Sequence, residues 1–318
     1  EEACTRGSID EAIAIDEVKR FIAEQDLKAE TRFVPKKIVP TLEGEFKEKI
    51  AIIGAGPAGL SCAFYLAEKG YYPTIFEKNE KPGGMLVYGV PSYKLEKDVV
   101  AAEIDIIKAM GVEIKTGVEV GKDITIDELR KQGYKAFYVA IGCQGGKKAG
   151  VPGEDATGVT TAVDFLREVS EKESYNLEGD VVVIGGGNVA IDAARCGGRV
   201  GDYKVTMFCL EDKEHMPASI EEIEEAEEEN IAINCGWGPK EILTENGKVT
   251  GVVFKKCVSV TDAEGRFSPV YDENEIMTVE CKHVIFSVGQ SIVWGDLLAG
   301  TKVELDRSGR AVADALTY

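Results

Sequence analysis

The stretch KIAIIGAGPAGLSCAFYLAEKGYYPTIFEK, residues 49–78, decides the fold. It begins with a short apolar run typical of a buried strand, and three glycines follow at the spacing G-x-G-x-x-G. An apolar helical stretch then runs to Gly70, and a second apolar run ends in the acid Glu77. A strand, a glycine turn, a helix and a second strand in this order predict a βαβ unit whose helix N-terminus can hold a diphosphate.

In such a dinucleotide-binding unit each glycine has its own task. Gly54 makes the turn, Gly56 lets the backbone approach a pyrophosphate, and Gly59 lets the helix pack closely against the strand. Glu77 can accept hydrogen bonds from the hydroxyls of an adenosine ribose. The alternative, a tight turn that binds no ligand, is the weaker interpretation because the whole strand–turn–helix–strand context is present.

The same pattern returns in DVVVIGGGNVAIDAARCGGRVGDYKVTMFCLED, residues 180–212, with Gly185, Gly187 and Ala190 at the turn. The repeat means either two dinucleotide sites or one site and a degenerate copy. Two sites that face each other suggest a permanently bound flavin and a nicotinamide nucleotide that comes and goes. Hydride then passes directly between the two rings, and the protein's task is alignment. We therefore assign no catalytic side chain, and a chain with two histidines suffices for this chemistry.

Composition excludes other classes. The formal charge of −19 over 318 residues argues against a nucleic-acid partner, whose phosphates would be repelled. No apolar run reaches the roughly 18 residues of a membrane span. The eight cysteines are widely spaced and form no C-x-x-C pair, which predicts reduced thiols in a cytoplasmic protein.

Beyond the two turns, strands and helices alternate, which predicts an α/β fold with parallel sheets. Residues 15–25, IDEVKRFIAEQ, have the apolar spacing of a helix. Ser219 and Glu222 form a capping-box signature at the start of the acidic run 219–230. We interpret this run as a helix with a solvated acidic face.

Several further motifs carry a resemblance to a known family. The chain resembles the flavin-binding small (beta) subunit family of NAD(P)H-dependent glutamate synthase, and the related flavin modules of dihydropyrimidine dehydrogenase and NADH-dependent ferredoxin:NADP oxidoreductase. The motifs are AIIGAGPAGLSCAFYLAEKG (51–70), EKPGGMLVYGVPSYKLEKDVV (80–100), YVAIG (138–142), VPGED (151–155), VVVIGGGNVAIDAAR (181–195), EHMPAS (214–219) and VIFSVGQ (284–290).

The resemblance implies two Rossmann-like domains of the pyridine nucleotide-disulfide oxidoreductase type, the second inserted in the first. The expected parts are a remnant of a helical iron–sulfur domain with a linker (1–46), a first FAD-binding segment (47–158), an NAD(P)-binding domain (159–287) and a truncated second FAD-binding segment (288–318). Cys4 is expected to ligate a [4Fe–4S] cluster in the full-length parent. We expect the present chain to be a fragment that lacks the cluster and holds FAD weakly or not at all.

The resemblance also implies a set of cofactor-binding residues. Those assigned to the flavin are Gly54, Gly56, Pro57, Ala58, Gly59, Glu77, Lys78, Gly84, Met85, Leu86, Lys94, Val120, Ala140 and Gly142; those assigned to the nicotinamide nucleotide are Gly185, Gly186, Gly187, Asn188, Val189, Asp192 and Glu211; Gly289 completes the set. Lys94 stands where relatives carry arginine, so the charge is kept but the bidentate fork is lost.

The segment Val205–Ser219 bears on the choice of nucleotide. Where the family usually has Tyr-Arg-Arg to grip the 2′-phosphate of NADP, this chain has Cys209, Leu210 and Glu211. Because Glu211 would repel a phosphate and accept from ribose hydroxyls, we expect NAD(H) to be preferred over NADP(H). The position that matches Glu77 is Cys209, however, and Lys213, Arg195 or Arg199 remain candidates for a phosphate contact. His215 is expected to be a surface or capping residue.

The function that follows is hydride transfer between NAD(P)H and FAD, with electrons passed to iron–sulfur centres or to a larger catalytic or electron-accepting subunit. Two alternatives stay open. One is an adrenodoxin-type ferredoxin reductase, which shares both glycine turns. The other is a non-catalytic subunit that binds nucleotide for structure or sensing.

Overall fold

The computed structural model describes residues 3–37, 46–172, 175–201 and 203–316. The chain divides into two units. The first comprises residues 1–83 and 96–140, and the second comprises residues 84–95 and 141–318. The predicted domain boundaries at 158/159 and 287/288 differ from this division and stay a prediction.

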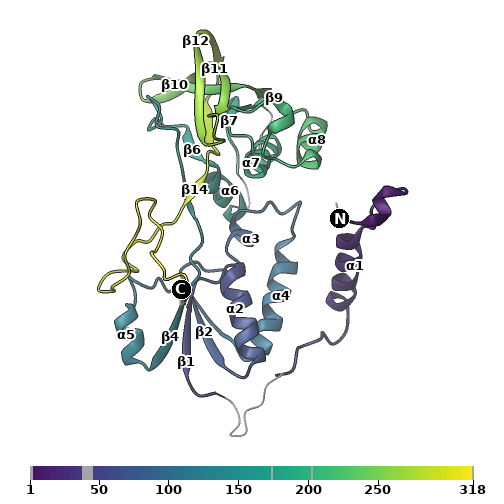
Figure 1. The fold of residues 1–318 in the computed structure, drawn as a ribbon, viewed down its shortest axis with the longest axis vertical. Coiled ribbons are helices and arrows are strands. Elements are labelled where there is room, and N and C mark those ends of the chain that lie inside the picture. The colour runs from purple at the N-terminus through teal and green to yellow at the C-terminus, as the bar shows by residue number, and fades with distance from the viewer. Residues whose placement is uncertain (1–2, 38–45, 173–174, 202, 317–318) are drawn as a thin grey trace. The chain divides into compact units, whose positions relative to one another are not determined.

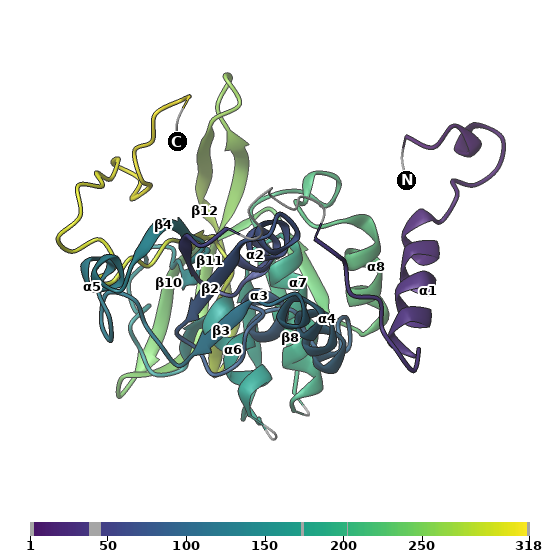
Figure 2. The same ribbon diagram turned by 90° about the horizontal axis from the view of Figure 1, so that it is seen from below.

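The first unit is built on a four-stranded parallel sheet in the order β3-β2-β1-β4, of which Figure 1 labels β2, β1 and β4. Helix α2 packs on β1 and β2 and also contacts α4 (Figure 2). The strands are β1 (Lys49–Ile53), β2 (Tyr72–Glu77), β3 (Glu113–Thr116) and β4 (Tyr134–Val139), and the helices are α2 (Pro57–Glu68), α4 (Lys97–Ala109) and α5 (Ile126–Lys131).

The N-terminal part of the first unit contains η1 (Thr5–Ser8) and α1 (Ile15–Leu27). The predicted helix over 15–25 is therefore confirmed. The Arg32 guanidinium, just beyond α1, donates to Glu103 at 2.6 Å and to the Ala102 carbonyl at 2.7 Å, which connects this part to α4. Part of the predicted linker, residues 38–45, lies outside the described residues.

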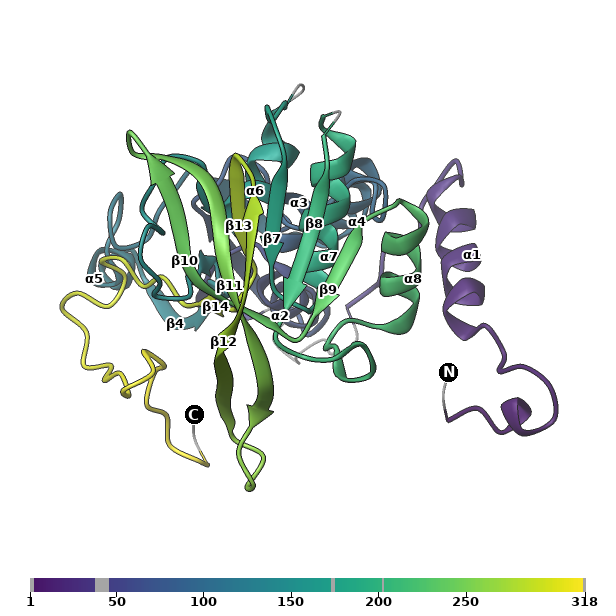
Figure 3. The same cartoon turned by 90° about the horizontal axis from the view of Figure 1, so that it is seen from above.

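The second unit contains a five-stranded parallel sheet in the order β6-β13-β7-β8-β9, of which Figure 3 labels β13, β7, β8 and β9. Its strands are β6 (Val159–Thr161), β7 (Val181–Ile184), β8 (Val205–Cys209), β9 (Ala232–Cys235) and β13 (His283–Phe286). The helical segments are α3 (Met85–Tyr88), α6 (Ala162–Glu171), α7 (Asn188–Arg199), η2 (Lys213–His215) and α8 (Ile220–Glu228).

Both faces of this sheet are covered. Along β7, Val181 and Val183 pack with residues of α6, α7 and α8. Val182 and Ile184 point the other way, into a cluster with a second, antiparallel sheet, where the rings of Phe208 and Phe254 stack at 4.0 Å. Burial on both faces explains why the strand is a continuous apolar run rather than an alternating one.

The antiparallel sheet is formed by β10 (Trp237–Glu245), β11 (Lys248–Thr261) and β12 (Phe267–Glu280). The turn between β10 and β11 is Asn246-Gly247, with φ of 51° and 74°, as that dipeptide predicts. A short antiparallel pair, β5 (Gly145–Gly146) and β14 (Gln290–Ser291), completes the second unit.

Candidate functional site

The first glycine turn has the geometry that its sequence predicts. Gly54 has φ of 106°, a conformation that favours glycine, and its N–H donates to the Phe76 carbonyl at 2.8 Å. An alanine Cβ at position 59 would lie 2.0 Å from the Gly54 carbonyl oxygen. Helix α2 therefore packs against the turn at a distance that only glycine permits at position 59.

Glu77, at the end of β2, is a buried carboxylate whose hydrogen bonds organise this turn. One oxygen accepts from the Ala55 N–H at 2.7 Å. The other accepts from the backbone N–H and the side-chain amide of Asn79, each at 2.8 Å. The ribose contact predicted for Glu77 would be added to these three hydrogen bonds.

The remaining residues assigned to the flavin divide between the units. In the first unit Val120 is buried, Lys78 is exposed, and the Ala140 N–H donates to the Ile53 carbonyl at 2.8 Å. The second unit contains Gly84, Met85, Leu86, Lys94, Gly142 and Gly289. Their flavin contacts stay a prediction.

The second glycine turn repeats the first with one informative difference. The Gly185 N–H donates to the Phe208 carbonyl at 2.9 Å, as Gly54 does to Phe76. Gly187 precedes α7, has an ordinary extended φ of −95°, and an alanine Cβ there would meet nothing within 4 Å. Neither backbone strain nor packing requires glycine at 187. A missing side chain at a helix N-terminus that faces open space is what close approach of a diphosphate needs.

Gly187 lines a cavity of about 770 Å³ within the second unit. The turn residues Gly185 to Val189 form one wall, and residues 209–211 at the end of β8 continue it. Residues 286–290, at and after the end of β13, also line the cavity, among them Gly289. Because the cavity lies at the carboxyl ends of parallel strands, it occupies the usual position of a nucleotide in such a sheet.

The end of β8 presents a thiol and then a carboxylate. Cys209 is buried, and burial raises the pKa of its thiol, with the nearby Cys235 adding to the shift. Glu211 lines the cavity next to the turn, since an alanine Cβ at Gly186 would lie 3.1 Å from its Oε2. Among the described residues no hydrogen bond or ion pair engages this carboxylate, so both of its oxygens remain able to accept from a ligand.

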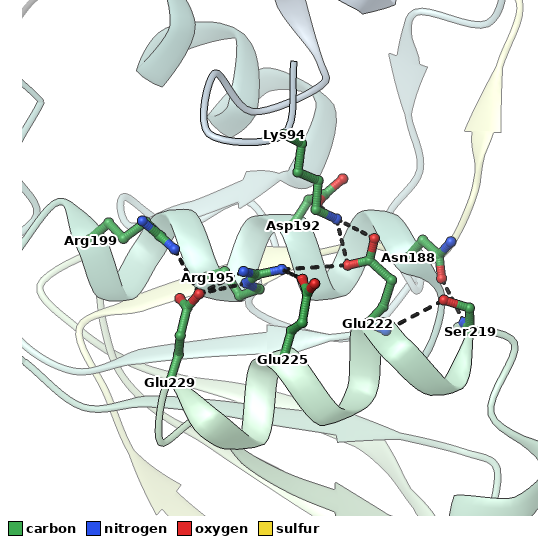
Figure 4. A network of polar contacts seen from close by, with 9 residues as sticks. All are labelled: Lys94, Asn188, Asp192, Arg195, Arg199, Ser219, Glu222, Glu225 and Glu229. Carbon is green, nitrogen blue, oxygen red and sulfur yellow. Dashed lines mark hydrogen bonds and ion pairs between the residues drawn. The ribbon is translucent and has the colours of Figure 1, made fainter. Parts of the chain in front are cut away.

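The three cations considered for a phosphate contact are paired with glutamates, and Figure 4 shows the two arginines among them. The Arg195 guanidinium is buried and donates to Glu225 and, at 2.7 and 2.9 Å, to Glu229. Arg199 donates to the same Glu229 at 2.7 Å. Lys213 lies 2.6 Å from Glu227. Most acidic side chains of the run 219–230 are exposed, as the predicted solvated face requires, and some of them also hold these cations.

Lys94 and Asp192 also belong to this network (Figure 4). The Lys94 ammonium lies 2.5 Å from an Asp192 oxygen on α7 and 2.5 Å from Glu222 on α8. Burial lowers the pKa of Lys94, but the two carboxylates outweigh it and the net pKa is raised. Ser219 accepts from the Glu222 N–H as predicted. The Glu222 carboxylate, however, binds Lys94, so the capping box is only half formed.

A family model, the pyridine nucleotide-disulphide oxidoreductases, matches residues 48–317. The chain belongs to this family. As a member, it is a flavoprotein oxidoreductase module that binds FAD and a nicotinamide nucleotide.

Two relatives illustrate the range of proteins in which this module occurs. The chain is 37% identical to the "NADP(+)-dependent formate dehydrogenase subunit beta" of Moorella thermoacetica, over 100% of this chain and 47% of that protein. It is 33% identical to the "Glutamate synthase [NADPH] small chain" of Escherichia coli, over 98% of this chain and 68% of that protein. The chain thus spans about half the length of several curated relatives that it matches.

Two solved structures share the fold of this chain. FprA of Mycobacterium tuberculosis, in complex with NADPH, aligns with a TM-score of 0.70 at 20% identity, over 82% of this chain and 74% of that chain. The thioredoxin reductase of T. acidophilum aligns with a TM-score of 0.60 at 23% identity, over 85% and 86% of the two chains.

His215, the histidine of the segment Val205–Ser219, is predicted from the sequence to be a surface or capping residue. His215 is exposed in η2, and its Nδ1 lies 2.7 Å from Asp212, whose carboxylate raises the pKa of the imidazole. It is a surface residue, as predicted.

Around Cys4, the described part of the chain offers no group of three or more His, Cys, Asp or Glu side chains that could hold a metal ion. The cluster-ligand role of Cys4 stays a prediction. No helix among the described residues is long and apolar enough to cross a membrane.

Sequence reasoning missed a further group of residues that line the cavity of the second unit. Trp237 and Pro239 of β10 and Phe267, Pro269 and Tyr271 of β12 all line it. These residues lie outside both glycine motifs. Their one sequence signal is the alternation Phe-x-Pro-x-Tyr at 267–271, which places the three side chains on one face of a strand.

Proposed function

We propose that the chain is the NADH-oxidising flavin module of a larger electron-transfer enzyme. The nucleotide site is supported above all by Gly187. This residue borders the cavity, and neither its backbone conformation nor its packing requires a glycine. The nucleotide supplies a hydride and FAD accepts it, so the chain's residues need only bind and align the two. Gly187 and the N-terminus of α7 would hold the diphosphate, and Glu211 the adenosine ribose.

The preference for NADH rests on charge at the end of β8. Glu211 has a free carboxylate at the cavity, which would accept from ribose hydroxyls and repel a 2′-phosphate. Arg195, Arg199 and Lys213 are paired with glutamates. Moving the buried Arg195 to a phosphate would leave Glu225 without its partner and Glu229 with Arg199 alone, which is costly.

One observation favours NADPH as the second candidate. Lys256 of β11 places its ammonium 4.9 Å from the ring centroid of Trp237, a residue of the cavity wall. Relatives of this chain carry NADP or NADPH in their names. In this alternative Lys256 would neutralise the 2′-phosphate in place of the missing arginines.

Flavin reduction by each nucleotide tests the proposal. In the purified full-length protein, we expect NADH to reduce bound flavin with a kcat/KM at least tenfold above that of NADPH. The pair of substitutions Leu210→Arg and Glu211→Arg should reverse the preference, and Lys256→Ala should leave it unchanged. Glu214→Arg is the matched control, because Glu214 is exposed in the same loop and does not line the cavity.

Two results would contradict the preference. One is a wild-type protein that uses NADPH better than NADH and loses that preference in Lys256→Ala. The other is a double variant whose preference is unchanged although it still binds nucleotide. Absence of any nucleotide-dependent bleaching of a bound flavin would instead support the non-catalytic alternative.

The remaining parts of the proposal concern the larger protein. The alignment of this chain with about half of its relatives' length supports a protein with further domains or subunits that accept the electrons. All eight cysteines are free, which supports a cytoplasmic location.

Backbone N–H groups of Ile13 and Arg6 lower the pKa of Cys4, and the thiolate is the form that ligates iron. Iron content of the full-length protein and of a Cys4→Ala variant tests this role.

A further inference from the structure

The hairpin of β11 and β12 extends beyond the strand that flanks it. β10 pairs with residues 248–256 of β11, and the Cys257 N–H donates to the Gly236 carbonyl just before β10. Beyond residue 257 the hairpin strands pair only with each other among the described residues. This outer part ends in the turn that Asp262 holds by accepting from the Arg266 N–H at 2.9 Å. Figure 3 shows the hairpin projecting past the end of the parallel sheet at which β8 ends.

One face of the outer hairpin borders the nucleotide cavity. Phe267, Pro269 and Tyr271 alternate along β12, and all three line the cavity. Phe267 is nonetheless 71% exposed, so its ring has little protein to pack against. Trp237, at the start of β10, lines the same cavity. We refer to Trp237, Phe267 and Tyr271 as the aromatic wall.

The topology of the sheet fixes which end of a dinucleotide meets this wall. In the order β6-β13-β7-β8-β9, the glycine turn follows β7, so the diphosphate lies over the middle strand. Glu211 after β8 marks the side of the adenosine ribose, and residues after β13 mark the opposite, nicotinamide side. Tyr271 belongs to the β8 side, because an alanine Cβ at Gly238 would meet both the Tyr271 ring, at 2.5 Å, and Leu210, at 2.8 Å.

We propose that the aromatic wall binds the adenine ring of the nicotinamide nucleotide. The inference rests on the proposed function and deepens it. Adenine is a flat apolar surface that stacks on aromatic side chains, and it lies next to the ribose that Glu211 accepts from. The turn holds the charged diphosphate while the hairpin supplies apolar contact on the other side. The arrangement matches the usual anatomy of a ligand site, a largely apolar pocket with a few placed polar groups.

The test separates the two halves of the nucleotide. In the full-length protein, we would measure dissociation constants for NADH, ADP-ribose and reduced nicotinamide mononucleotide, in the wild type and in Phe267→Ala/Tyr271→Ala. The double variant should bind NADH and ADP-ribose about ten- to a hundredfold more weakly, because base stacking contributes on that scale. Binding of the mononucleotide, which has no adenine, should stay within about twofold.

Two controls guard against indirect effects. Val270→Ala removes an exposed side chain from the opposite face of β12 and should leave all three dissociation constants unchanged. Tyr271→Phe keeps the ring and should retain wild-type affinity, whereas a merely structural defect from losing the tyrosine would appear as a lowered Tm in the double variant.

Each outcome is decisive. Unchanged ADP-ribose binding in the double variant overturns the aromatic wall while leaving the nucleotide site intact. Equal weakening of NADH and the mononucleotide also overturns it, because the wall would then serve the nicotinamide. Absence of binding of any of the three ligands to the wild type refutes the proposed function itself, and this failure is distinguishable from the first two.

Discussion

The two glycine turns of this chain share their geometry and differ in how they use their acid. In both, the N–H of the first glycine donates to the carbonyl of the penultimate residue of the next strand, Phe76 or Phe208. At the first turn the Glu77 carboxylate accepts from three N–H groups of neighbouring loops. At the second turn the corresponding residue is the thiol of Cys209, and the carboxylate of Glu211, two residues later, has no partner among the described residues.

The difference shows that the same motif can have its acid and its glycines engaged within the protein or left accessible to a ligand. The first turn is locked by its own acid and by the close approach of Gly59 to Gly54. The second has Ala190 in place of that third glycine and leaves a free carboxylate and the open position of Gly187 at a cavity. A turn held by its own acid suits a permanently bound ligand and an open turn suits a ligand that exchanges. This agrees with the prediction that the first turn binds the flavin and the second turn the nicotinamide nucleotide.

Gly59→Ala should have the largest effect of the substitutions that test this comparison. The added Cβ would lie 2.0 Å from a backbone oxygen, which no side-chain rotation relieves. We expect the free energy of unfolding to fall by about 3 kcal/mol or more, the upper range of overpacking. The matched change, Ala190→Gly, should cost only about 1 kcal/mol. Chemical denaturation of both variants measures the difference, and similar midpoints would show that the two turns are equally tight.

Gly187→Ala should affect binding rather than stability. The methyl group enters open space at an ordinary φ, so unfolding should change by less than about 0.5 kcal/mol. The same methyl group would stand where the diphosphate approaches, and we expect the dissociation constant for NADH to rise about a hundredfold, or about 2.7 kcal/mol. Gly198→Ala on the same helix makes only ordinary contacts and serves as the control. Wild-type affinity in Gly187→Ala would remove the main support for the nucleotide site.

Glu77→Gln tests the lock on the first turn. A glutamine keeps one acceptor but must point an NH₂ group at either the Ala55 or the Asn79 N–H, so one buried donor loses its partner. The expected loss of stability is about 2 kcal/mol. Glu211→Gln, by contrast, disturbs no hydrogen bond and should stay within about 0.5 kcal/mol. Thermal denaturation of the pair measures this, and equal losses would mean that the two carboxylates do not differ in role.

The sequence predicts the helices and strands around both turns because the periodicity of apolar residues and the spacing of glycines are local signals. The strands, the helices that follow, the exposed His215 and the tight contact of Gly59 all follow from residues near in sequence. Long-range pairing has no such signal. Nothing local indicates that Lys94 meets Asp192 and Glu222, or that Arg195 is neutralised by the acidic helix instead of facing a phosphate.

The aromatic wall escapes sequence reasoning for a different reason. Alternation along 267–271 predicts that Phe267, Pro269 and Tyr271 share a face, but not what that face meets. That depends on how far the hairpin extends past β10 and on the packing of Gly238 beside Leu210. Both are properties of the assembled sheet.

The smallest effect concerns the thiol that replaces an acid at the second turn. Burial raises the pKa of Cys209 well above its usual range, so the folded protein keeps this proton at a pH where the unfolded chain has lost it. Its stabilising contribution is complete below the ordinary thiol pKa of about 8.5 and declines as pH rises above it, because the unfolded state then binds fewer protons. Between about pH 8.5 and 9.5 this thiol should lower stability by roughly 1 kcal/mol, and Cys209→Ala should show a correspondingly shallower decline. Parallel alkaline profiles for the wild type and Cys209→Ala would mean that the thiol ionises as readily in the folded protein as in the unfolded chain, contrary to its burial at the end of β8.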